Sequence, residues 1–328
     1  MAKHAEPAKY AKHIVSPDPI IDPCWDPVFK SIFTRDTTQS EIARKKLLSA
    51  ILEEPVKELS ISANEPPVSR LDQRQIRYDI QCLFNSGERA DIEMTLYPHK
   101  WEVFRMEYYL SRLFANQEIR EEKGSYKTLK RSYQISLLAR GKLFEDKSFD
   151  HRFVYYDPES KIPFGGLTAI ITLELEKLAV TAEKAVSAMS EKERWAVFFK
   201  YYNDTERQPL IQEITREEEG IAMAADVISG FTAAEVAFFH EMSVEKYELD
   251  MRAHAQEAEE IGEARGEARG EARGRAEGEA RGWKKGLAEG EARGEVRGEA
   301  RERARVLNLL KKAGYDTQGI EAALKNSE

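Results

Sequence analysis

Cysteine is scarce in this chain of 328 residues, which contains only two, Cys24 and Cys82. So few thiols argue against a disulfide framework and against a zinc site built from cysteine. Long apolar runs are also missing: no stretch of about 18 apolar residues is present, so we expect no membrane-spanning segment. The first twenty residues contain lysines and prolines but no apolar core of a secretory signal. These absences together predict a protein of the reducing cytoplasm.

An excess of positive charge is absent as well. The chain has 50 Lys and Arg against 58 Asp and Glu, for a formal net charge of −8. The basic footprint of a typical nucleic-acid-binding domain is therefore missing, and any contact with nucleic acid requires a local patch. The six histidines show no metal-ligand spacing, and no glycine-rich phosphate loop occurs in the first half of the chain.

The composition that remains favours a folded α/β domain with appendages. Hydrophobic residues make up 41%, enough for a core, whereas the 33% of charged residues is high for one compact domain. Changes in pattern along the chain indicate five segments. They are an extended N-terminal arm (1–21), an α/β domain (22–180), a helical region (181–260), a low-complexity repeat (261–303) and a short helical hairpin (304–328).

Apolar periodicity and turn residues give the expected elements of the first three segments. We expect a helix over 36–52 and another over 102–117, with strands at 76–84, 90–97, 134–138, 153–156 and 167–175. Two capping boxes, at Ser190–Glu193 and Thr232–Glu235, predict helix starts in a mostly helical stretch over 178–258. The aromatic cluster over 195–202 is more typical of core packing than of a base-stacking surface.

The predicted hairpin over 76–97 carries the acidic residues of most interest. Side chains alternate along a strand, so Asp79 on the first strand and Glu93 on the second share one face. Two carboxylates at close range repel each other unless a cation lies between them. A hard divalent ion such as Mg²⁺ suits these oxygen ligands and can activate water toward a phosphodiester. The alternative is a pair of solvent-facing acids, ion-paired with Arg77 or Arg89.

Four short motifs, in order and at similar spacing, resemble the Rpn family of recombination-promoting nucleases, which belongs to the PD-(D/E)XK nuclease superfamily and is also described as transposases. The motifs are DPVFK at 26–30, RYDI at 77–80, DIEM at 91–94 and RMEYY at 105–109. The resemblance covers roughly 22–180. It implies a restriction-endonuclease-like mixed sheet flanked by helices, and a DNA endonuclease that uses Mg²⁺ or Mn²⁺.

The resemblance also implies roles for particular residues. Asp79 and Glu93 would be metal ligands together with the main-chain carbonyl of Met94, and Asp26 would be an acid near the site. One position departs from the family, because Thr95 stands where the family has Gln and the wider superfamily has Lys. A threonine hydroxyl can orient water but cannot stabilise charge as a lysine does.

Two questions about this site remain open from the sequence. Thr95 leaves the protein either active, with another side chain such as Lys30 in the missing role, or inactive, as a nuclease-like module that binds nucleic acid or a protein. Arg105 either contacts phosphate or pairs with Glu102 or Glu107.

The repeat tail has a glycine at every fourth position from Gly262 to Gly298, with Glu after most glycines and Arg before most. In a helix, four residues turn by about 400°, so each residue type forms a slowly winding row with like charges at i,i+4. One interpretation is a flexible linker. The other is a helix that associates with a second copy, the Glu row of one chain facing the Arg row of the other. The inverted block 275–277 could then help set the register.

Overall fold

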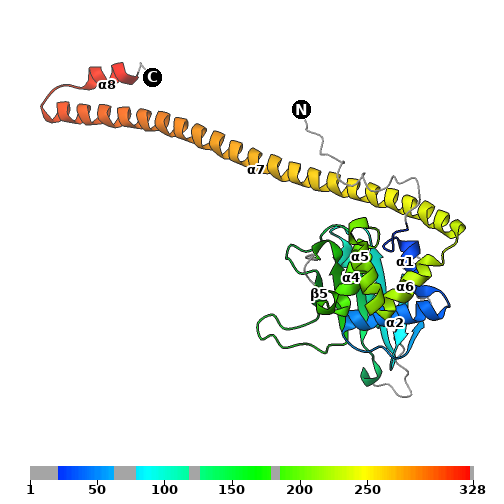
Figure 1. Ribbon diagram of the computed structural model, residues 1–328. Helices are drawn as coiled ribbons and strands as arrows, with labels where there is room; N and C mark the ends of the chain where they lie inside the picture. The colour runs from blue at the N-terminus through cyan, green and yellow to red at the C-terminus, as the bar shows by residue number, and fades with distance from the viewer. Residues whose placement is uncertain (1–20, 63–78, 118–125, 179–184, 326–328) are drawn as a thin grey trace, which may run out of the picture. The chain divides into compact units, whose positions relative to one another are not determined.

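The computed structural model describes residues 21–62, 79–117, 126–178 and 185–325 (Figure 1). The chain divides into two compact units, Met1–Arg252 and Ala253–Glu328. The first unit contains the sheet, and the second contains the whole repeat.

A six-stranded mixed sheet forms the centre of the first unit, in the order β1-β2-β3-β4-β6-β5. Neighbouring strands β3, β4 and β6 run parallel, while β1–β2, β2–β3 and β5–β6 are antiparallel. The strands are β1 Leu59–Ile61, β2 Ile80–Phe84, β3 Glu88–Thr95, β4 Ser132–Leu138, β5 Asp150–Phe153 and β6 Thr168–Glu174.

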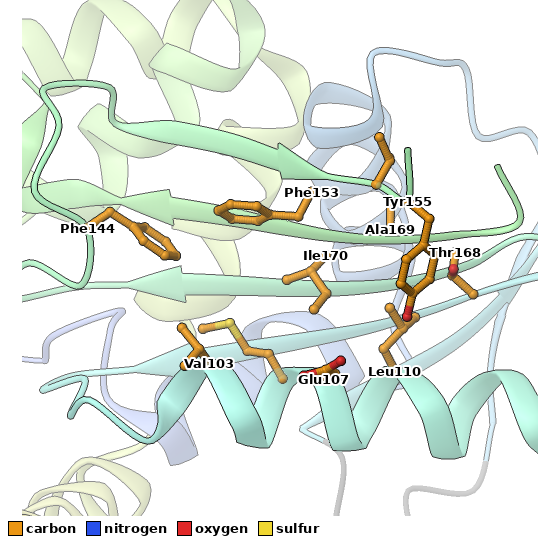
Figure 2. A pocket seen from close by; sticks show the side chains of 11 residues that line it. Val103, Glu107, Leu110, Phe144, Phe153, Tyr155, Thr168, Ala169 and Ile170 are labelled. Atoms are coloured by element: carbon orange, nitrogen blue, oxygen red, sulfur yellow. The ribbon is translucent and has the colours of Figure 1, made fainter. Parts of the chain in front are cut away.

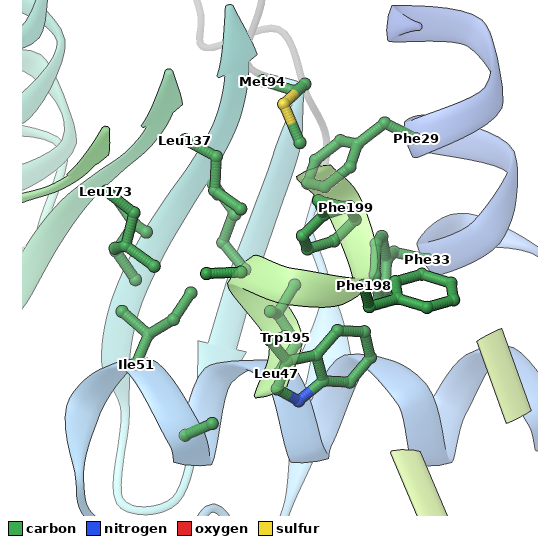
Figure 3. Packing of buried hydrophobic residues seen from close by; sticks show 14 of the residues in the cluster. Phe29, Phe33, Leu47, Ile51, Met94, Leu137, Leu173, Trp195, Phe198 and Phe199 are labelled. Carbon is green, nitrogen blue, oxygen red and sulfur yellow. The ribbon is translucent and has the colours of Figure 1, made fainter. Parts of the chain in front are cut away.

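Helices cover both faces of the sheet and bury its side chains. One face packs against α1 Asp26–Thr34, α2 Thr38–Leu52 and α4 Glu191–Tyr201, and α5 Gln208–Glu217 and α6 Glu219–Ser229 complete that layer. Figure 3 shows this core, in which Phe29, Phe33, Leu47 and Trp195 lie beside strand residues such as Leu137. The opposite face packs against α3 Glu102–Ala115. This α/β architecture, a mixed sheet flanked by helices, confirms the predicted restriction-endonuclease-like fold.

Several local predictions are confirmed and one strand is misplaced. The two capping boxes are present, since Glu193 N donates to Ser190 Oγ (3.1 Å) and Glu235 N donates to Thr232 Oγ1 (3.3 Å). The aromatic cluster is core, because Trp195, Phe198 and Phe199 are buried. The strand predicted at 153–156 is wrong for most of its length: β5 ends at Phe153. Residues 154–156 are apolar but exposed, so burial did not produce that pattern.

The repeat is helical in the structure, within α7 Ala233–Lys312, which begins in the first unit. A turn at Gly314 (φ 82°) leads to α8 Gln318–Lys325. Ion pairs at i,i+4 within the repeat occur where its order is broken, as in Glu271–Arg275, Arg273–Glu277 and Glu277–Arg281. The inverted block therefore supplies opposite charges that the regular repeat does not place at that spacing.

Across the described ranges, no single helix is long and apolar enough to cross a membrane. The one pair of helices that passes the same test jointly, α6 with α7, is bent by 99° between them.

Candidate functional site

The antiparallel register of β2 and β3 brings Asp79 and Glu93 together. Ile80 pairs with Ile92, so Asp79, which directly precedes β2, lies opposite Glu93. Asp79 N donates to Glu93 Oε1 (3.1 Å), and Met94 N donates to Asp79 Oδ2 (3.2 Å). Each carboxylate is thus held by the main chain of the other's strand.

Both carboxylates are buried rather than exposed to solvent. Asp79 is 7% exposed and Glu93 is 3% exposed. The alternative of two solvent-facing acids is therefore wrong. Arg89, one of the partners considered in that alternative, donates to the main-chain carbonyl of Asn116 (3.0 Å). Arg77 lies outside the described residues.

Helix α1 supplies a cation to this acid pair. Lys30 Nζ lies 2.9 Å from Asp79 Oδ1 and 3.1 Å from Asp26 Oδ1. Asp26 and Lys30 are one helical turn apart and face the same side, because residues at i and i+4 are neighbours on a helix. The structure therefore brings Asp26, Lys30 and Asp79 into one cluster, although 49 positions separate Lys30 from Asp79 in the sequence.

Helix α3 supplies a second cation from the other side. Arg105 forms an ion pair with Glu93 and another with Glu102 (Nη1 to Oε1, 3.1 Å). Its guanidinium also lies over the Tyr109 ring, 4.9 Å from the centroid. Pairing with Glu102, one of the alternatives left open by the sequence, is present, while the contact with Glu93 is one that sequence reasoning did not name.

Burial controls the protonation of the acid pair. Burial, followed by the charge of Asp79, raises the pKa of Glu93 to about 8 against the opposing effect of Arg105. Burial and the charge of Asp26 raise the pKa of Asp79, with Lys30 opposing. Burial alone would raise the pKa of Asp26, but Lys246 and Lys30 outweigh it and the net shift is downward. Without a metal ion, Glu93 is therefore mostly protonated at neutral pH, and a divalent cation at the pair would favour its ionised form.

Asp91 adds a third carboxyl on the same face of β3. It is completely buried, and its register partner on β4 is Gln134. Neither of its carboxyl oxygens has a hydrogen-bond partner of good geometry among the described residues. Burial, followed by the charge of Glu93, raises the pKa of Asp91 well above its usual range. Asp91 therefore keeps its proton to a higher pH than an exposed aspartate does.

Thr95 lies at the end of β3, beside Leu138 of β4. Among the described residues, no hydrogen bond joins its hydroxyl to Asp79 or Glu93. The cation nearest Asp79 comes instead from Lys30 on α1. Lys30, which the sequence suggested as a substitute, is therefore placed where its charge reaches the acid pair.

The donor set has the chemistry of a site for a hard divalent cation. Asp79 and Glu93 offer carboxylate oxygens, and such ions prefer oxygen ligands completed by water. Among the described residues, no group of three or more His, Cys, Asp or Glu side chains has metal-binding geometry. The ammonium of Lys30 and the guanidinium of Arg105 provide the positive charge at these oxygens in this structure.

One residue of the cluster was missed by sequence reasoning. Lys246 on α7 places its Nζ 3.5 Å from Asp26 Oδ1. It belongs to no motif, and 220 positions separate it from Asp26. Only the tertiary packing of α7 brings it to the site.

An apolar pocket lies farther along the same face, between α3 and strands β5 and β6. Figure 2 shows Phe153, Tyr155 and Ile170 on one side, facing Val103 and Leu110 on α3. The pocket has a volume of about 270 Å³. None of its lining residues belongs to the acidic cluster, so it is a separate feature of this face.

Comparison with known proteins identifies a family for this chain. Residues 23–258 match a family described as PD-(D/E)XK nuclease family transposase. No curated protein and no solved structure matches the chain. The matched segment contains the whole acidic cluster, including Lys246, and ends before the glycine repeat.

Proposed function

Because the chain belongs to the PD-(D/E)XK nuclease family transposases, we propose that it is a metal-dependent DNA endonuclease of recombination-promoting type. It hydrolyses phosphodiester bonds at the pair Asp79 and Glu93. The observation that best supports this proposal is the pair itself: two buried carboxylates on facing strands, each held by the other strand's main chain.

Asp79, Glu93 and the main-chain carbonyl of Met94 would hold the ion, Mg²⁺ or Mn²⁺. When bound, such an ion polarises the phosphodiester and lowers the pKa of water to make a nucleophile. The side chains that surround the pair would position the phosphate and stabilise its negative charge.

Lys30 and Arg105 are each held by a second carboxylate outside the proposed metal pair. Lys30 contacts Asp26 as well as Asp79, and Arg105 contacts Glu102 as well as Glu93. Each cation can therefore stay at the site when Asp79 and Glu93 are engaged by a metal ion. There Lys30 would stabilise negative charge that develops on the phosphate, the role for which the superfamily uses the lysine replaced here by Thr95.

The second candidate is a nuclease-like module that binds DNA or a protein without cutting. The observation that favours it is Thr95, whose hydroxyl makes no hydrogen bond to the acid pair within the described residues. The position of Lys30 supports the active alternative instead. The two candidates differ in one measurable property, which is cleavage.

The test is cleavage of plasmid DNA in Mg²⁺ by the wild type, Asp79→Ala and Glu93→Ala. Glu213→Ala serves as a matched control, because this glutamate is exposed on α5, outside the acidic cluster. We expect the wild type and the control to nick the plasmid and both site variants to lose this activity. Equal activity in all four proteins would overturn the assignment.

We also propose that the repeat pairs with a second copy of the chain. The regular repeat has like charges at i,i+4, and its side chains are exposed along the helix. Ten helical glycines, each less favourable than alanine by about 1 kcal/mol, make an isolated helix marginal. Complementary rows on another chain would offset part of that cost.

A further inference from the structure

The first turns of α7 belong to the same compact unit as the acidic cluster and pack beside it. Trp25, which precedes α1, contacts His240 with ring centroids 5.9 Å apart. Tyr97, which follows β3, contacts Tyr247 with centroids 5.8 Å apart. Tyr247 and Met251 also pack against the main core. This part of α7 therefore lies beside the acidic cluster.

Lys246 lies on this part of α7 and contacts the cluster. Its Nζ lies 3.5 Å from Asp26 Oδ1, and its side chain remains 39% exposed. Asp26 is Lys246's only ion-pair partner among the described residues, at a distance near the upper limit for such a pair. Lys30 and Arg105, by contrast, each contact two carboxylates. Lys246 is thus the cation of the cluster that has the fewest carboxylate partners among the described residues.

The charges around the cluster suggest a role for Lys246 in binding an anionic ligand. Among the described residues, Lys30 pairs with Asp26 and Asp79, and Arg105 pairs with Glu93 and Glu102. A phosphodiester is an anion, so any ionised carboxylate at this site opposes its approach. A third cation at the edge of the cluster reduces that repulsion and offers a direct partner to a phosphate oxygen.

We propose that Lys246 binds a phosphate of the DNA backbone beside the acid pair, so that the first turns of α7 form part of the DNA-binding surface. This inference rests on the proposed function and names a substrate-contacting residue for it. A purely structural role, in which Lys246 only attaches α7 to α1, is the competing explanation. An exposed ion pair of this kind contributes little to stability, so the two explanations predict different measurements.

The test compares Lys246→Met, Lys246→Gln and Lys246→Arg with a matched control, Arg252→Met. Arg252 lies on the same helix but pairs with Glu248 (3.5 Å) and does not reach the cluster. Binding of a short fluorescent DNA duplex is measured by anisotropy in Ca²⁺, which allows binding to be observed apart from cutting. The titration is repeated from about 50 to about 200 mM salt.

We expect Lys246→Met and Lys246→Gln to bind roughly five-fold more weakly at low salt. The slope of log affinity against log salt should fall by about 0.9, the contribution of one phosphate contact. Lys246→Arg, which keeps the charge, and Arg252→Met should bind like the wild type. In Mg²⁺ the neutral variants should raise KM and leave kcat nearly unchanged. A change in folding stability alone would not alter the salt slope in this way.

The outcomes separate this inference from the proposed function. If the wild type cleaves DNA and the neutral variants keep its affinity and salt slope, only the assignment of Lys246 is overturned. If the wild type neither binds nor cleaves DNA, the proposed function is overturned and this inference with it.

Discussion

Replacing Lys30 with methionine tests the arrangement of the site in the most detail. The substitution keeps an unbranched side chain of similar length and removes the ammonium that lies 2.9 Å from Asp79 and 3.1 Å from Asp26. That ammonium opposes the rise in the pKa of Asp79 and contributes to the fall in the pKa of Asp26. Its loss should therefore raise both pKa values.

Two effects should then move in opposite directions at pH values where the carboxylates are ionised. A divalent ion no longer competes with the ammonium at Asp79, so Mn²⁺ should bind at least as tightly as in the wild type. Cleavage should fall by roughly 10²–10³-fold, the usual effect of removing one group that stabilises transition-state charge. A variant that binds metal well but cuts poorly would separate holding the ion from stabilising the phosphate.

The assay pairs calorimetric titration with Mn²⁺ and single-turnover cleavage of a labelled duplex at about pH 9, above the pKa of about 8 for Glu93. Lys45→Met is the matched control, because Lys45 forms an i,i+4 pair with Glu41 (2.7 Å) on α2, in the same spacing as Lys30 and Asp26. Wild-type turnover in Lys30→Met would refute the proposed role of this lysine. Loss of metal binding would refute the competition between Lys30 and the ion.

Three further predictions follow from the same structure. Since the pKa of Glu93 is raised from 4.5 to about 8, the metal-free protein should lose stability as the pH rises between these two values. Metal affinity should rise over the same pH range. Glu93→Gln should flatten both trends, the first measured by thermal melts and the second by metal titrations. Thr95→Gln should change the cleavage rate by less than about ten-fold, because Lys30 already supplies charge; cleavage that appears only in this variant would favour the inactive module. A chain ending at Glu260 should be monomeric by light scattering at low salt, whereas the full chain should associate modestly. That association should be lost in high salt, because exposed ion pairs contribute only about 0–1 kcal/mol each and are screened by salt. Monomers of both proteins at low salt would refute self-association.

The hairpin could be predicted from the sequence because its signals are local. Strand alternation placed Asp79 and Glu93 on one face, and the turn around Gly87 (φ 106°) supplied the reversal. Burial of the pair could not be predicted in this way, because it depends on α1 and α3, which pack against the hairpin. A polar strand face reads as solvent-exposed until the element that packs over it is known.

Contacts between distant segments could not be read from local patterns. Lys30 reaches Asp79 because α1 packs against β2 and β3. Lys246 reaches Asp26 because the start of α7 contacts the residues that flank α1, as in Trp25–His240 and Arg35–Glu235. The pattern of apolar residues within α1 or α7 does not indicate that Lys30 contacts Asp79 or that Lys246 contacts Asp26. The motif around Lys30 raised it as a candidate, whereas Lys246 lies outside every motif.

The most direct test of the central claim measures metal binding and cleavage on the same proteins. The claim is that Asp79 and Glu93 hold the ion that cuts DNA. Mn²⁺ is titrated into the wild type, Asp79→Asn and Glu93→Gln, which keep the shape of each side chain and remove its charge, and DNA cleavage is followed across the same Mn²⁺ concentrations. We predict that the wild type binds Mn²⁺ and begins to cut over the same concentration range, and that each variant loses both properties. Unchanged Mn²⁺ binding and cleavage in the two variants would contradict the claim.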